Sequence, residues 1–146
     1  MFRKCWFNIL IFMLLVSNVY AEDQKKQVFH INPDFEADLG YSHAVKVGDV
    51  LYISGTVGWG NMPEAIDIAY TRLAGTLKAS NLDFRHVVKE TIFTTQLDAL
   101  KSAKEVRKKY YGDSFPAATW VQVERLFSPE LILEVEIIAH FPAKAH

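Results

Sequence analysis

The sequence predicts a small α+β domain of two layers, in which one mixed β-sheet carries two helices on one of its faces. Three observations predict this class. Runs rich in β-branched residues lie in both halves of the chain, two segments with helical periodicity lie among them, and Gly, Asn or Pro residues mark most junctions. The expected order of elements is β-β-β-α-β-α-β-β. At 146 residues the chain is long enough for one domain with its own core.

The first three expected strands are short. Residues 28–31 form the first, and Asn32-Pro33-Asp34 ends it. Residues 44–47 and 50–54 are apolar and β-branched on either side of Gly48-Asp49, a pattern that predicts a hairpin.

A flexible loop and then a helix are expected next. The loop is indicated by three glycines around a tryptophan: Gly55, Gly58, Trp59 and Gly60. Pro63 and Glu64 suit the first turn of a helix, which Ser80-Asn81 ends. The expected inner face of this helix recurs at three- and four-residue spacing: Ala65, Ile68, Ala69, Arg72, Leu73, Thr76 and Leu77.

The second half contains one more helix and three strands. Residues 87–96 are β-branched and predict a strand. Asp98 is expected to cap a helix that runs through Tyr111, with Gly112 after its end. Its apolar stripe is Leu100, Ala103, Val106 and Tyr110. Residues 119–124 and 131–140 alternate in strand fashion. Because both helices cover one sheet face, the apolar residues of the other face predict subunit association.

The N-terminus resembles a removable export signal. Arg3 and Lys4 precede an apolar run over residues 6–16, and Val19 and Ala21 form a small-residue cleavage pattern. The run is shorter than the roughly 20 residues that span a bilayer; an uncleaved anchor is the alternative. The expected division is a signal peptide at 1–21, a flexible arm at 22–27 and one domain at 28–146. The mature protein would then be periplasmic or secreted, with no membrane attachment.

Composition excludes several classes of function. The only cysteine, Cys5, belongs to the expected signal, so the mature chain would have no disulfide or thiol nucleophile. Without Arg3 and Lys4, 14 of the 16 basic residues face 17 acidic ones, so nucleic acid and anionic membranes are poor partners. The sequence has no metal-binding, phosphate-binding or dinucleotide-binding motif, and its five histidines are scattered. No cofactor or metal is expected.

Two carboxylates in the last strand are candidates for chemistry. Glu134 and Glu136 are two residues apart in an apolar strand, so both side chains face the same side. One interpretation is a solvated or paired strand face. The other is a general acid/base whose pKa burial raises toward neutrality.

Several segments together resemble the RidA/YjgF family. They are Gly40-Tyr41-Ser42-His43-Ala44-Val45, Gly48-Asp49, Leu51-Tyr52-Ile53-Ser54-Gly55, Val87-Val88-Lys89-Glu90-Thr91-Ile92-Phe93, Phe115-Pro116-Ala117, Val121-Gln122-Val123-Glu124-Arg125-Leu126 and Leu133-Glu134-Val135-Glu136. The resemblance covers residues 40–142. It implies a homotrimer of chorismate-mutase-like subunits with small-molecule clefts between neighbours. For the active branch it implies hydrolysis of reactive enamines and imines to keto acids and ammonia.

The resemblance also assigns roles to particular positions. Tyr41 would line the cleft, the backbone at Ser54-Gly55 would hold the substrate carboxylate, and Glu134 would position the attacking water. The family's carboxylate-clamping arginine does not carry over, because Ala118 stands at its position. Two further departures lie in the same site: Trp120 stands where a small residue is usual, and Lys104 where the active branch often has asparagine.

Three functions remain open from the sequence. The first is a RidA-like trimer that binds a small, less anionic or aromatic metabolite, with Glu134 as the polar contact and an aromatic lining of Tyr41, Trp59, Phe93 and Trp120. The second is an imine deaminase (2-iminobutanoate/2-iminopropanoate deaminase-like) with a different cation; the candidates are Lys104, Arg107 and Arg125. The third is a trimer that binds proteins and no small ligand.

Overall fold

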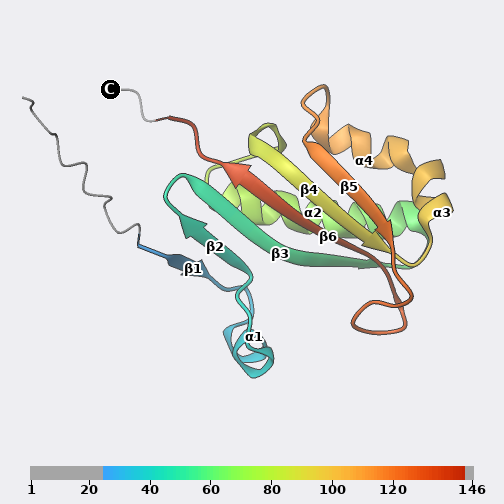
Figure 1. Cartoon of the computed structure of the whole chain (residues 1–146), viewed down its shortest axis with the longest axis horizontal. Helices are drawn as coiled ribbons and strands as arrows, with labels where there is room; N and C mark the ends of the chain where they lie inside the picture. The colour runs from blue at the N-terminus through green and yellow to red at the C-terminus, as the bar shows by residue number, and fades with distance from the viewer. Residues whose placement is uncertain (1–24, 144–146) are drawn as a thin grey trace, which may run out of the picture.

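One six-stranded mixed sheet forms the centre of the domain. The computed structural model describes residues 25–143, and the expected signal peptide lies outside them. The strands have the spatial order β1-β2-β3-β6-β4-β5 (Figure 1). Their bounds are β1 Gln27–Phe29, β2 Ala44–Val47, β3 Val50–Trp59, β4 Val87–Thr94, β5 Ala117–Gln122 and β6 Leu131–His140. Neighbours are antiparallel except β4 and β5, which are parallel. The predicted α+β class and the β2–β3 hairpin are confirmed.

Three helices and a 3-10 turn cover one face of the sheet. They are α2 (Met62–Ala79), the turn η1 (Phe84–His86), α3 (Leu97–Ser102) and α4 (Lys104–Tyr111). In the view of Figure 1, α2 passes behind the strands, and α3 and α4 lie beyond β5. A further short helix, α1 (Pro33–Leu39), projects beyond the β2 end of the sheet. No helix within residues 25–143 is long and apolar enough to cross a membrane.

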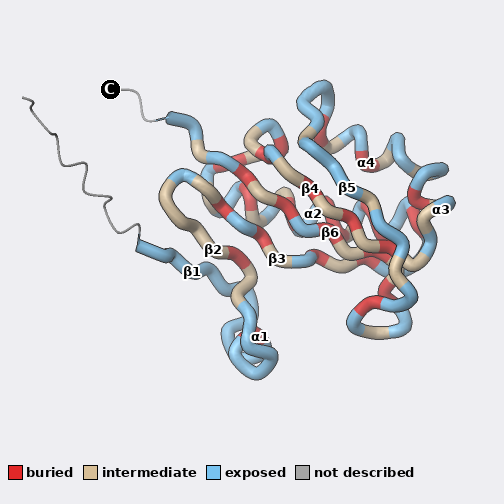
Figure 2. The backbone as a smooth tube through the Cα atoms, viewed as in Figure 1, coloured by how far each residue is buried: buried red, intermediate tan, exposed pale blue. Residues whose placement is uncertain are grey.

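The core lies between the sheet and α2, as the burial colours of Figure 2 show. Asn61 begins the helix with a capping box: its side chain accepts from the Glu64 N–H, and the Glu64 carboxylate accepts from the Asn61 N–H. Four residues of the expected inner face are buried: Ala65, Ala69, Leu73 and Leu77. Arg72 and Thr76 lie at the border of that face, where they line cavities instead of the core.

The structure corrects two expectations in the first half. Asn32-Pro33 begins a helix instead of only ending a strand: the Asn32 side chain accepts from the Phe35 N–H, and Pro33 takes the first helical position. The expected glycine loop is instead the second half of β3. A Cβ on Gly58 would lie 2.1 Å from the carbonyl oxygen of Ala65. Glycine is therefore needed there because β3 approaches the backbone of α2 closely.

The second helical segment also differs from its prediction. It divides at Ala103 into α3 and α4, and it begins at Leu97 after Gln96, with no side-chain cap. Asp98 is thus inside the first turn and does not cap the helix. β5 begins at Ala117, two residues before the expected start.

The sheet face away from the helices is open within the described chain. Along β6 the residues Leu131, Leu133, Val135, Ile137 and Ala139 are buried, and the alternate residues are more exposed. Apolar side chains on the open face remain partly accessible; Tyr52 is 47% exposed and Val121 39%.

Candidate functional site

A β-bulge in β3 is the geometric centre of the candidate site. Ile53 pairs with Ile137 and Thr56 pairs with Val135, so Ser54 and Gly55 together stand opposite one residue of β6. Ile53 and Thr56 are both buried toward the helices. The extra residue of a bulge leaves the regular ladder and re-aims the backbone, a feature that is frequent next to active sites.

Glu134 lies directly over this bulge. A Cβ on Gly55 would be 1.9 Å from the Glu134 Oε1 atom, so the carboxylate occupies the space that any larger residue would fill. The Glu134 side chain is half-buried and lies on the open sheet face with Glu136, as the alternation predicts. Burial raises the pKa of the Glu134 carboxyl, and the nearby charge of Glu136 raises it further.

Tyr41 joins the bulge through the segment that precedes β2. The Ser54 hydroxyl donates to the Ser42 carbonyl at 2.7 Å, and the Ser54 N–H donates to the His43 carbonyl at 3.0 Å. A cavity of about 420 Å³ opens beside them. Its lining is Ile31, Asn32, Phe35, Glu36, Tyr41, His43, Gly55, Thr56, Val57 and Arg72. This volume is within the usual range for small-molecule sites, about 300–1,000 Å³.

Glu36 fixes the wall of this cavity and was not singled out from the sequence. Its buried carboxylate accepts N–H groups from Ile31, Asn32 and His43 and contacts the His30 ring. Desolvation by burial opposes ionisation, but these hydrogen bonds outweigh it and lower the pKa of Glu36 to about 2. The sequence signal that could have revealed it is the helix start at Asn32-Pro33, which places an acid on α1 facing β2.

Phe93 and Trp59 lie near the bulge but have different neighbours. Phe93 is in register with Glu134 across β4 and β6 and lines a second pocket with Glu134 and Arg125. Trp59, at the end of β3, lies under the guanidinium of Arg72, 4.7 Å from its ring centroid. Tyr41, Ser54, Gly55, Phe93 and Glu134 are therefore gathered around β3 and β6, with Trp59 at the border.

The other predicted site residues lie elsewhere in the subunit. Ala118 and Trp120 are in register with Glu90 and Ile92, whose side chains are buried on the helix side. Trp120 thus points toward α4, not into the cleft with Glu134. Lys104 is exposed at the start of α4, in the same layer. Within one subunit Trp120 therefore does not meet Glu134, and the expectation that it lines a cleft between neighbouring subunits stays a prediction.

Arg107 is not available as a substitute cation. It is buried and pairs with Glu90 through a 2.7 Å contact of Nη2. The hydroxyls of Tyr70 and Tyr111 donate to the other Glu90 oxygen. This cluster holds α2, α4 and β4 together. No group of three or more His, Cys, Asp or Glu side chains suitable for a metal occurs in the part of the chain that the structure describes.

Comparison with known proteins identifies the family of this chain. The family model described as Endoribonuclease L-PSP, which defines the RidA/YjgF family, matches residues 32–141. The chain belongs to this family. The RidA/YjgF membership agrees with the sequence resemblance and with the observed fold.

Named relatives within the RidA/YjgF family include enzymes. The 2-iminobutanoate/2-iminopropanoate deaminase of Bos taurus is 34% identical over 108 residues, which cover 68% of this chain and 78% of that protein. The human deaminase is 32% identical over 108 residues, with the same coverage. A solved YjgF/YER057c/UK114 family structure from Mycobacterium tuberculosis has a TM-score of 0.73 at 26% identity, covering 80% of this chain and 99% of its own.

Proposed function

We propose that this chain hydrolyses small reactive 2-imino acids to 2-keto acids and ammonia, with Glu134 as the general acid/base. The observation that carries the proposal is the Glu134 carboxylate lying over the Gly55 bulge with a raised pKa. A carboxyl group with a pKa displaced toward neutrality is suited to move a proton in both directions. The deaminase names of the relatives support the same reaction class.

The reaction needs one water and one proton carrier. Water attacks the imine carbon while the Glu134 carboxylate accepts a proton from it and passes this proton to the imine nitrogen, which gives a carbinolamine. Glu134 then accepts the hydroxyl proton of the carbinolamine and donates it to the amine nitrogen; the carbonyl forms as the C–N bond breaks, and ammonia leaves. Each proton that Glu134 accepts is given back, so the carboxylate is regenerated.

The assembly that we propose for this activity is a homotrimer. The partly exposed apolar residues of the open sheet face, such as Tyr52 and Val121, favour association. Ala118, Trp120 and Lys104 would reach a Glu134 cleft only if they came from a neighbouring subunit. Light scattering of the purified chain tests this assembly: a mass near that of one subunit would refute it.

An imine-trapping assay tests the reaction. An amino-acid oxidase generates the imino acid, and semicarbazide captures what has not been hydrolysed. The wild-type protein should reduce the captured fraction, and Glu134→Gln should abolish this effect. Glu136→Gln is the matched comparison: it keeps the Glu134 carboxylate but removes the neighbouring charge that helps to raise its pKa, so it should weaken the effect without abolishing it. An unchanged rate in Glu134→Gln would contradict the assigned role.

If wild-type protein does not accelerate imine loss, the binding function is the alternative. A thermal-shift panel of small carboxylates and aromatic metabolites then separates a small-molecule site from a protein-binding trimer, since a ligand of the native state raises the melting temperature.

A further inference from the structure

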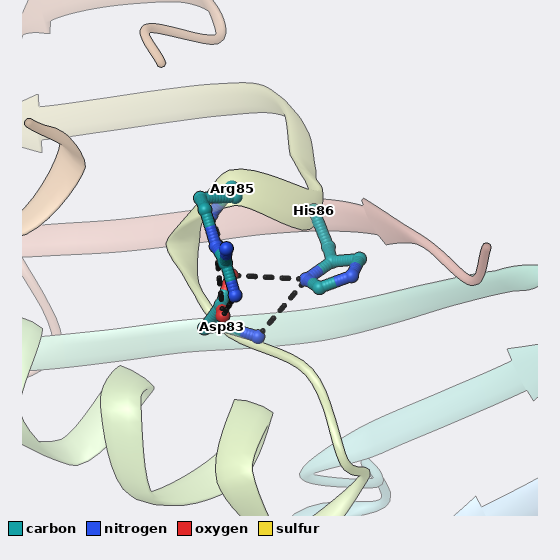
Figure 3. Close-up of polar contacts among 3 residues, drawn as sticks. All are labelled: Asp83, Arg85 and His86. Atoms are coloured by element: carbon teal, nitrogen blue, oxygen red, sulfur yellow. Dashed lines mark hydrogen bonds and ion pairs between the residues drawn. The ribbon is translucent and has the colours of Figure 1, made fainter. Parts of the chain in front are cut away.

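The arginines of the described chain differ in their ion-pair partners. Arg85 is bound on the surface by Asp83, through Nε to both carboxylate oxygens and Nη2 to one, beside His86 (Figure 3). Arg107 is buried against Glu90. For Arg72 and Arg125, no carboxylate among residues 25–143 lies within ion-pair distance.

Arg72 borders the cavity that contains Tyr41 and Gly55. It comes from α2, is exposed, and its guanidinium lies over the Trp59 ring at 4.7 Å from the centroid. An aromatic face orients a guanidinium through cation–π attraction and leaves its N–H edges available for a planar, two-pronged contact. The arrangement supplies a positioned cation with unused donors.

The acidic group of the same cavity does not neutralise Arg72. The Glu36 carboxylate accepts three backbone N–H groups and contacts the His30 ring, so its oxygens are already occupied. An anion that enters the cavity therefore meets Arg72 as a cation without a competing ion pair.

We propose that Arg72 is the carboxylate-binding residue of this cleft and that it belongs to the same subunit as Tyr41, Gly55 and Glu134. The inference rests on the proposed function for the identity of the site. Gly55 links Arg72 to Glu134, because it lines the cavity that Arg72 borders and the Glu134 carboxylate lies over it. The carboxylate would contact the Arg72 fork, and the reactive carbon would lie near the bulge.

The cavity also predicts the class of ligand. Its volume of about 420 Å³ is larger than a three- or four-carbon acid needs, and part of its lining is apolar: Ile31, Phe35, Tyr41 and Val57. The ligand is therefore a monocarboxylate with an apolar or aromatic side chain, derived from a hydrophobic amino acid. Such a side chain would lie against Phe35 and Tyr41, whose rings meet edge to face.

Arg125 is the competing candidate and the matched control. It lines the pocket of Phe93 and Glu134 on the open face, also without a carboxylate partner among residues 25–143. If Arg125 held the carboxylate, the anion would lie on the other side of Glu134, away from Gly55 and Tyr41. Arg72→Gln and Arg125→Gln therefore distinguish the two placements.

The experiment measures binding, so it does not depend on catalysis. The stable keto acid 4-methyl-2-oxopentanoate is titrated calorimetrically into the full mature chain, its Arg72→Gln and Arg125→Gln variants, and Arg72→Lys. We expect Arg72→Gln to weaken binding about ten- to a hundredfold, the size expected for losing a charged hydrogen-bond partner. Arg125→Gln should stay within about twofold, and Arg72→Lys should recover part of the loss because it keeps the charge but not the fork. The neutral amide of the same ligand should bind the wild type and Arg72→Gln equally.

The outcomes separate the two proposals. Keto-acid binding that depends on Arg72, in a protein with no imine hydrolysis, would support Arg72 and refute the enzyme. Hydrolysis that persists with unchanged binding in Arg72→Gln would refute Arg72 alone. Loss of keto-acid binding in Arg125→Gln and not in Arg72→Gln would also overturn the assignment of Arg72. So would the absence of binding by the wild-type protein at millimolar keto acid. Circular dichroism of each variant checks folding, which an exposed helix position should preserve.

Discussion

Two glycines of the same strand offer a direct test of how the site is built. In Gly55→Ala the new Cβ would lie 1.9 Å from the Glu134 Oε1 atom and 2.7 Å from its Cδ. An ordinary contact begins near 3.4 Å, so the carboxylate must retreat by about 1.5 Å. The Glu134 Cγ would lie 2.8 Å from the new Cβ, so the side chain of Glu134 has to move from Cγ outward, but these three nearest contacts include no backbone atom. In Gly58→Ala the new Cβ would lie 2.1 Å from the Ala65 carbonyl oxygen, which is part of the α2 backbone.

The two substitutions should therefore fail in different ways. Gly55→Ala should fold with nearly unchanged stability but lose about 100-fold in kcat/KM, the order expected when a catalytic group is misplaced by 1 Å or more. Because alanine keeps the backbone N–H, this loss would report on Glu134 alone. Gly58→Ala should instead lose about 3 kcal/mol of stability by overpacking, lowering Tm by more than about 5 °C.

Imine trapping, urea denaturation and an NMR titration of Glu134 together decide the outcome. In Gly55→Ala the displaced carboxyl should become better hydrated, so its raised pKa should fall toward the ordinary value, whatever the catalytic rate. Full activity with an unshifted pKa in Gly55→Ala would refute the contact between the bulge and Glu134. Equal destabilisation by both substitutions would refute the distinction between a movable side chain and a fixed helix backbone.

Three further predictions concern stability. Arg107→Met should lower the free energy of unfolding, measured by urea denaturation, by about 3–5 kcal/mol, because it leaves the Glu90 carboxylate buried without its cation. Arg85→Met changes a surface pair and should cause no measurable loss of stability. Similar losses in both variants would contradict the importance of the buried Arg107–Glu90 pair. The Glu36 pKa of about 2 lies below the ordinary 4.5, so its stabilisation is complete above about pH 5 and disappears as the pH falls toward 2; in Glu36→Gln, acid melting curves should show a shallower pH dependence, and an unchanged slope would refute this origin. Gly75→Ala should raise the free energy of unfolding by about 0.5–1 kcal/mol, because Gly75 lies inside a helix and the new Cβ would meet no atom within 4 Å. A lower Tm would show that the new Cβ clashes with a neighbouring group.

The sequence was most informative where periodicity and turn chemistry agreed. The hairpin at Gly48-Asp49, the helix after Asn61 and the alternation along β6 all have a buried face that repeats at the spacing of the element. The same alternation placed Glu134 and Glu136 on one face. Tyr41, Ser54-Gly55 and Glu134 came from the family resemblance, and the structure brings them together at the bulge.

Other features depend on contacts that sequence spacing does not report. α1 has no apolar stripe to detect, because Phe35 and Leu39 are exposed and only Glu36 is buried. Glycines in β3 were interpreted as a loop because their cause, close approach to Ala65 and Glu134, involves distant segments. The direction of Trp120 depends on the register of β5 with β4, which alternation within one strand leaves undetermined.

The contact between Arg72 and Trp59 also gives the protein its own optical signal. The chain has three tryptophans; Trp6 lies outside the described residues, and signal cleavage would remove it. Trp120 packs toward α4 beneath Arg107 and lies on β5, which β6 and β4 separate from β3 in the sheet. An anion bound at the N–H edges of Arg72 would change the electrostatic surroundings of the Trp59 indole and therefore its emission, and Trp120 would remain as an internal reference. Occupancy of the cleft could then be followed by intrinsic fluorescence in unlabelled protein, with Trp59→Phe as the blank.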